Sequence, residues 1–153
     1  MPTLLATRRA VPGDAPAIAP LLGQLGYPST PDQVAARFAR IAGRGDDAVW
    51  VAEDETGTVV GLATGHVHRP LERDLPLAQL TALVVDASRR GTGAGRALVA
   101  VFEEWARAAG CDRVTVSSAF RRTGAHAFYE RLGYGQRSKK FDKTLDGEPP
   151  QDS

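Results

Sequence analysis

The stretch "RRGTGAGRAL", residues 89–98, decides the fold because it places three glycines at alternate positions directly before an amphipathic segment. A tight strand-to-helix turn with positive φ accounts for one glycine, or two. Three positions without side chains also let a ligand approach the backbone, and the helix that follows presents unpaired amides and the positive end of its dipole. We therefore interpret the stretch as a phosphate or pyrophosphate site, with a purely structural turn as the alternative. Three arginines add positive charge around it: Arg89, Arg90 and Arg96.

The common nucleotide-binding motifs do not fit this stretch. A Walker loop requires a lysine followed by serine or threonine after its last glycine, and no lysine is near. A dinucleotide fingerprint, G-x-G-x-x-G, fails from Gly91, where Arg96 takes the last position, and from Gly93, where Leu98 takes it. The acidic residue expected about 20 positions later is also absent. The phosphate ligand is therefore of another kind.

The rest of the chain alternates strand-like and helix-like patterns around this stretch. The predicted order is strand, two helices, three strands, helix, strand, helix and one or two closing strands, which is typical of a mixed sheet with helices on its faces. The predicted strands are 3–10, 48–54, 59–69, 77–86, 112–118 and 135–145, and the predicted helices are 14–25, 31–42, 95–109 and 123–133. Asp14 and Thr30 are the expected N-caps of the first two helices.

Length and composition restrict the class of protein. The 153 residues predict one domain over residues 1–145, followed by a disordered tail at 146–153. The net charge of +1 favours neither nucleic acid nor a membrane surface as a partner. The single cysteine, Cys111, excludes an internal disulfide, and no cysteine–histidine cluster has zinc spacing. Without an apolar span or a signal core, the expected location is the cytoplasm.

Two motifs in the second half of the chain carry a resemblance to a known family. Arg90, Gly93 and Gly95 match [Q/R]-x-x-G-x-[G/A], and "AHAFYERLGY" at 125–134 matches A-x-x-F-Y-x-x-x-G-[FY]. Residues 77–134 therefore resemble the cofactor-binding half of the GNAT superfamily of acetyl-CoA-dependent N-acetyltransferases. The resemblance implies an α/β fold with a central, mostly antiparallel sheet of six to seven strands and helices on both faces.

The resemblance also implies a set of residues that bind coenzyme A. The pyrophosphate is expected on the glycine stretch, namely Arg90, Gly91, Thr92, Gly93, Ala94, Gly95 and Arg96. The pantetheine arm is expected along the backbone of Leu83, Val84 and Val85, where the family's sheet splays and leaves backbone groups unpaired. Ser118 stands where many relatives carry an asparagine that binds the cofactor. No metal is expected.

Tyr129 is the expected catalytic residue. The resemblance places its hydroxyl at the thioester sulfur, where a phenol with a reference pKa of about 10 can protonate the leaving thiolate, whose thiol has a pKa of about 8.5. General-acid assistance of this kind contributes about 10²–10⁴-fold to the rate. The alternative is that Tyr129 is a core aromatic like Phe128.

The base that accepts the proton of the amine is left open. Many relatives carry glutamate on the strand before the glycine stretch, but this chain has Gln79 there. The candidates are His66, His68, Glu72, Asp74 and a water chain. The expected reaction is direct attack of an amine on acetyl-CoA in a ternary complex, and the alternative is an acyl-CoA-binding module with weak activity. The acceptor is a small molecule or a peptide, and the protein is a monomer or a homodimer.

Overall fold

The structure is a computed structural model that describes residues 5–117, 123–138 and 141–147. The chain divides into two compact units, residues 1–116 and 117–153. Among the described residues, the first contains the sheet and three α-helices, and the second contains one helix. The single domain over residues 1–145 stays a prediction.

The first unit is built on a five-stranded sheet in the order β1-β2-β3-β4-β5. Its strands are Ala6–Arg9, Asp47–Glu53, Val59–His68, Leu77–Val85 and Arg113–Val116. The first three pairings are antiparallel and β4 with β5 is parallel, so the mixed α/β class is confirmed.

The expectation of six to seven strands exceeds the five that are found. The described residues of the predicted closing segment, 135–138 and 141–145, contain no strand. The physical reason lies in the sequence "GQRSKKFDKTL", which is mostly polar and has no alternating apolar face to bury. Its two large apolar residues among those described, Phe141 and Leu145, are exposed.

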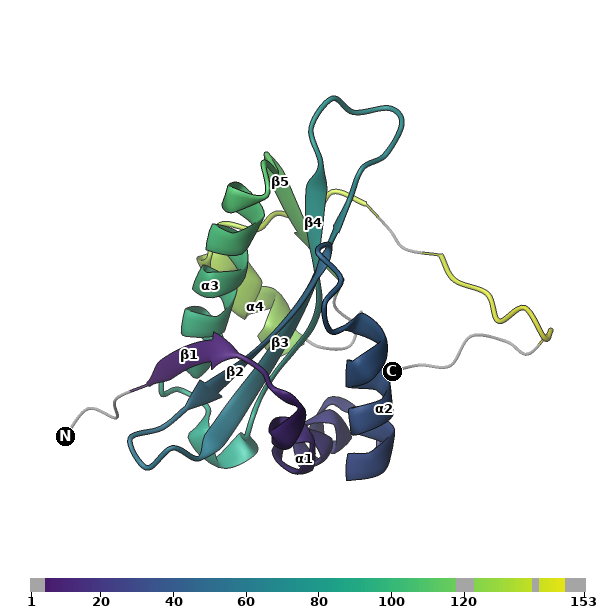
Figure 1. The fold of residues 1–153 in the computed structure, drawn as a ribbon. Helices are drawn as coiled ribbons and strands as arrows, with labels where there is room; N and C mark the ends of the chain where they lie inside the picture. Colours follow the sequence, from purple (N-terminus) through teal and green to yellow (C-terminus); the bar gives the residue numbers. More distant parts are fainter. Residues whose placement is uncertain (1–4, 118–122, 139–140, 148–153) are drawn as a thin grey trace. The chain divides into compact units, whose positions relative to one another are not determined.

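Helices α1, Ala15–Leu25, and α2, Pro31–Ile41, cover one face of the sheet (Figure 1). The predicted cap of α2 is confirmed, because the Thr30 hydroxyl accepts a hydrogen bond from the Gln33 amide at 3.1 Å. The predicted N-cap position of α1 is confirmed, but the side chain there makes no capping hydrogen bond. Asp14 stands at the N-cap position, but its carboxylate accepts bonds from Arg8 and from the Val11 amide at 2.8 Å instead.

Helix α3, Ala94–Ala108, packs on the opposite face of the sheet, as the prediction of helices on both faces requires (Figure 1). Glycines on β3 allow this close approach. A Cβ added at Gly65 would lie 3.0 Å from Phe102 Cδ1 and from Trp105 Cζ3, and one at Gly61 would lie 3.0 Å from Leu98 Cδ1. The α3 face is therefore packed against bare strand backbone.

The second unit contains helix α4, Thr123–Arg131. It ends as a Schellman motif, because the Tyr134 amide donates to the Tyr129 carbonyl and the Gly133 amide to the Glu130 carbonyl, both at 3.0 Å. Gly133 has a φ of 93°, which explains the glycine of the "ERLGY" motif. Across the described residues, no helix has the length and apolar character needed to span a membrane.

Candidate functional site

The glycine stretch forms the predicted strand–loop–helix connection. Strand β4 ends at Val85, the short 3₁₀ helix η2 spans Ala87–Arg89, and α3 begins at Ala94. Gly91 and Gly93 have φ values of 82° and 92°, so both positions favour glycine on conformational grounds. A Cβ at Gly91 would meet nothing within 4 Å, and one at Gly93 would meet only Leu5 Cδ1, at 3.9 Å. The space beside the loop is therefore open.

The first turn of α3 presents free amides to this open space. Gly93 is the N-cap residue, and the first intrahelical bond runs from the Ala97 amide to the Gly93 carbonyl at 3.0 Å. The amides of Ala94, Gly95 and Arg96 donate no hydrogen bond to any acceptor within residues 5–117. Unpaired amides together with the positive end of the helix dipole make an anion site.

Two of the three predicted arginines remain available beside this site. Arg90 and Arg96 are exposed and make no ion pair with any described residue. Arg89 is different, because its guanidinium donates to Asp54 Oδ2 at 2.7 Å. The expectation that Arg89 adds free charge around the loop is therefore wrong.

Asp54 anchors the loop from the turn between β2 and β3. Its side chain is 1% exposed and also accepts bonds from the amides of Thr56 and Thr58 and from the Thr56 hydroxyl. These bonds, that of the Thr56 hydroxyl above all, hold the pKa of Asp54 below its usual range. Gln24 on α1 adds a second anchor by accepting a bond from the Ala87 amide at 2.8 Å. The loop is thus fixed from two sides before any ligand binds.

One edge of β4 is left open beside the loop. The parallel pairing with β5 covers Leu77–Leu80 and stops there. On the β3 side, Thr64 faces Ala82 and Gly65 faces Leu80, so Thr81 is the extra residue of a β-bulge. Beyond the bulge, the strands that the structure describes leave the β5-side edge of β4 unpaired, as the predicted splay requires.

Backbone alternation shows which groups of β4 point to this edge. The Asp86 amide donates to the Val60 carbonyl at 2.8 Å, so the amide and carbonyl of Val84 also face β3. Those of Leu83 and Val85 then face the open edge. Val84 itself is buried, in the core under α1.

Two of the expected residues, Ser118 and Tyr129, do not belong to the first unit. Ser118 falls outside the described residues. Tyr129 is half-buried on α4, in the second unit, and its ring contacts those of Phe128 and Tyr134 at centroid distances of 5.2 and 5.7 Å. The loop residues and Leu83–Val85 are brought together by the first unit alone.

The base candidates differ in their surroundings. His66 Nδ1 lies 2.9 Å from Asp47 Oδ1, whereas the ring of His68 stacks on the ring of His66. Glu72 and Asp74 are exposed in the loop before β4. Sequence reasoning named His66 but missed Asp47, because nothing local in the sequence links residues 19 positions apart.

The described residues favour neither a cysteine nucleophile nor a metal centre. Burial raises the pKa of the half-buried Cys111 thiol, which disfavours the nucleophilic thiolate. Among the described histidine, cysteine and acidic side chains, no group of three or more could hold a metal ion.

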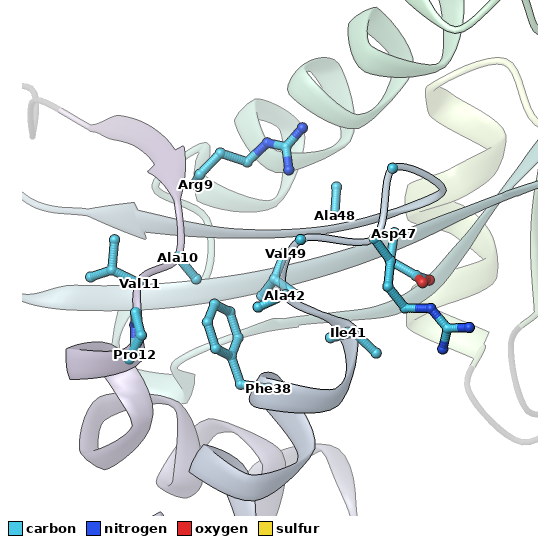
Figure 2. A pocket seen from close by; sticks show the side chains of 13 residues that line it. Arg9, Ala10, Val11, Pro12, Phe38, Ile41, Ala42, Asp47, Ala48 and Val49 are labelled. Carbon is cyan, nitrogen blue, oxygen red and sulfur yellow. The ribbon is translucent and has the colours of Figure 1, made fainter.

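Two adjoining cavities lie where α2 ends and β2 begins. The first, of about 450 Å³, runs from Pro12 to Asp47 past Phe38 and Val49 (Figure 2). The second, of about 520 Å³, is lined by Ile41, Arg44, Gly45, Asp46, Asp47 and His66. Neither is lined by the glycine loop, so these cavities are separate from the anion site.

Comparison with known proteins places these features in a family. Residues 17–134 match the description "Acetyltransferase (GNAT) family". An aminoalkylphosphonate N-acetyltransferase of Salmonella typhimurium is 37% identical over 89 residues, which span 58% of each chain. An aminoglycoside N(6')-acetyltransferase type 1 of Stenotrophomonas maltophilia is 28% identical over 135 residues, 86% of this chain and 87% of that one. A glucosamine-6-phosphate N-acetyltransferase structure from Arabidopsis thaliana, 23% identical, shares the fold with a TM-score of 0.82 over 94% of this chain and 99% of that one.

Proposed function

The chain belongs to the GNAT family of acetyltransferases, and from this premise we propose that it moves acetyl from acetyl-CoA to the primary amine of a small molecule. The observation that carries the proposal is the uncapped start of α3 behind two positive-φ glycines. The transfer is direct, by attack of the amine on the thioester in a ternary complex. No covalent enzyme intermediate is needed, which agrees with the raised pKa of the Cys111 thiol.

The first unit supplies the groups that bind acetyl-CoA. The amides of the loop and of the first turn of α3, residues 90–96, bind the pyrophosphate, and Arg90 and Arg96 add charge. The pantetheine arm carries amide groups that pair with the edge backbone of Leu83 and Val85, in the way an added strand would. The arm thereby satisfies backbone groups whose burial without a partner costs about 1–3 kcal/mol each.

Tyr129 supplies the proton for the leaving group. As the amine nitrogen bonds to the carbonyl carbon, the carbon–sulfur bond breaks and negative charge develops on sulfur. A phenol hydroxyl that donates a hydrogen bond, and then its proton, to that sulfur stabilises the charge. The support is its position in the A-x-x-F-Y motif, on a helix whose end is fixed by Gly133.

The acceptor is a small polar amine. Two of the relatives are named for an aminoalkylphosphonate and for an aminoglycoside, both small molecules with amino groups. The match to the first spans 58% of its length, so we carry over the class of acceptor and not the compound.

A free-thiol release assay tests the function. Acetyl-CoA is offered with 2-aminoethylphosphonate, with kanamycin and with a lysine-containing peptide. We expect release with a small amine and a rate about 10²–10⁴-fold lower for Tyr129→Phe. Tyr134→Phe is the matched control, since it removes a hydroxyl from the neighbouring ring in the same unit and should keep the wild-type rate.

Two results would count against the proposal. Equal rates for Tyr129→Phe and the wild type would remove Tyr129 from the mechanism. If the thiol of coenzyme A is released at the same rate with and without each of these three amines (the panel), transfer to a small amine is contradicted.

A further inference from the structure

The cavity at the start of β2 contains a paired acid and imidazole. The Asp47 side chain is 19% exposed and that of His66 is 45% exposed, and both residues line the cavity. An ionised carboxylate only accepts hydrogen bonds, so the Nδ1 of His66 carries the hydrogen of the 2.9 Å contact. In the neutral ring, Nε2 then holds the free lone pair. Asp47 therefore fixes His66 in the tautomer that accepts a proton at Nε2.

The register places this pair beside the bulge in β4. Thr64 and His66 are two positions apart on β3, so they share a face and lie about 7 Å apart along the strand. The Thr64 hydroxyl lies 2.5 Å from that of the bulge residue Thr81, and His66 faces Gln79 as its partner on β4. An amine held beside His66 is thus close to the point where β4 and β5 part.

The alternation of side chains along β2 and β3 also shows from which face of the sheet Asp47 and His66 project. Asp47 is two residues before Val49, which belongs to the core under α1 and α2, and Thr64 is two residues after Leu62 of the same core. Asp47 and His66 therefore project from the α1–α2 face, just beyond the part that these helices cover. The cavity there is open to a small molecule.

We propose that the acceptor amine binds in this cavity, that Nε2 of His66 takes its proton, and that Asp47 is the positioning residue that holds the imidazole. This inference rests on the proposed function. The ammonium group loses one proton to His66, and the neutral amine forms the nitrogen–carbon bond while the carbon–sulfur bond breaks. Sulfur takes one proton from the acid, and the second nitrogen proton restores that acid. One proton is released in all, and it leaves from His66 to solvent.

The charged neighbours of His66 are few and mostly paired. Asp46, in the segment before β2, pairs with Arg69 at 3.0 Å. Arg44 lines the cavity and makes no ion pair with a described residue. His68 stacks on the His66 ring but does not line the cavity, so it provides a matched comparison on the same strand.

The test is the pH dependence of kcat/KM with the amine that the panel shows to be acetylated fastest. We expect His66→Gln to lower kcat/KM by about 10²–10⁴-fold at neutral pH and to abolish the acidic limb of the profile. Asp47→Asn should give a smaller loss and keep that limb, because the imidazole remains but its tautomer is no longer fixed. His68→Gln should keep both the rate and the limb.

A second measurement needs no turnover. The protein has three histidines, so a ¹³C-histidine spectrum is simple, and His66→Gln assigns the signal. With coenzyme A bound, the amines of the panel should move the His66 signal. The proposal is overturned if His66→Gln retains the wild-type profile, or if no amine of the panel moves that signal.

Failure of this inference is distinguishable from failure of the proposed function. Thermal protection by acetyl-CoA reports on the glycine loop and should be equal in His66→Gln and the wild type. If acetyl-CoA protects both proteins but His66→Gln transfers acetyl as fast as the wild type, only the assignment of His66 as the base is wrong. If acetyl-CoA does not protect the wild type, the proposed function itself is wrong.

Discussion

At the scale of single residues, Gly93 combines a backbone requirement with an open approach. Its φ of 92° costs a residue with a side chain about 1–2 kcal/mol. Gly93→Val should therefore lower the melting temperature, and its side chain would project into the space where we place the pyrophosphate. We expect the variant to lose the rise in melting temperature that acetyl-CoA gives the wild type.

Gly110→Val is the matched control for this prediction. Gly110 has a φ of 88° at the other end of α3, with nothing within 4 Å of an added Cβ. The control should lose similar stability yet keep the acetyl-CoA shift. A full shift in Gly93→Val would show that the loop does not hold the cofactor.

Local chemistry explains which residues could be assigned from the sequence. The glycines, the Thr30 cap and the end of α4 at Gly133 depend on neighbours within a few positions, and the sequence alone predicts them. Arg89 was assigned wrongly because its partner Asp54 is 35 positions away in sequence. Two arginines side by side look alike in sequence, although one is paired with a buried carboxylate and the other is exposed.

At the scale of elements, the contact between α3 and β3 depends on glycine. A Cβ at Gly65 would lie 3.0 Å from both the Phe102 and the Trp105 rings, and Phe102 is fully buried and cannot move aside. We expect Gly65→Ala to lower the free energy of unfolding by about 1–3 kcal/mol, measured by urea denaturation.

The same substitution on α1 should have the opposite sign. Gly23 is exposed within α1, and an added Cβ would meet nothing within 4 Å. Gly23→Ala should raise the free energy of unfolding by about 0.5–1 kcal/mol, because glycine is a poor helix former. Equal effects at the two positions would contradict the close packing of α3 on β3.

The elements also show where sequence patterns stop being informative. The residues of β4 are plainly strand-like, but the bulge at Thr81 and the end of pairing at Leu80 are properties of three strands together. Hydrophobic alternation within one strand cannot locate either. The open edge of Leu83 and Val85 was therefore expected from family resemblance and not from the residues themselves.

At the scale of the whole molecule, acid stability should depend on two buried carboxylates. Asp14 and Asp54 are 7% and 5% exposed. The bonds from Arg8 hold the pKa of Asp14 below its usual range, and those from Thr56 do the same for Asp54. Both groups stay ionised in the folded protein at a pH where the unfolded chain has begun to take up protons.

The sign of the pH dependence follows from this difference. Above the ordinary carboxyl pKa of about 3.9, both carboxylates contribute their full stabilisation. As the pH falls below that value toward the lowered pKa values, the unfolded chain binds up to about two more protons at these sites than the folded protein does, so the stabilisation is lost.

Asp14→Asn/Asp54→Asn should be less stable at neutral pH, and its melting temperature should fall less steeply on acidification. Glu55→Gln/Glu104→Gln, which removes two exposed carboxylates, should keep the wild-type slope. Melting curves recorded from neutral pH into the acid range would then converge for the first variant and the wild type, whereas parallel curves would show that these two carboxylates do not control acid unfolding.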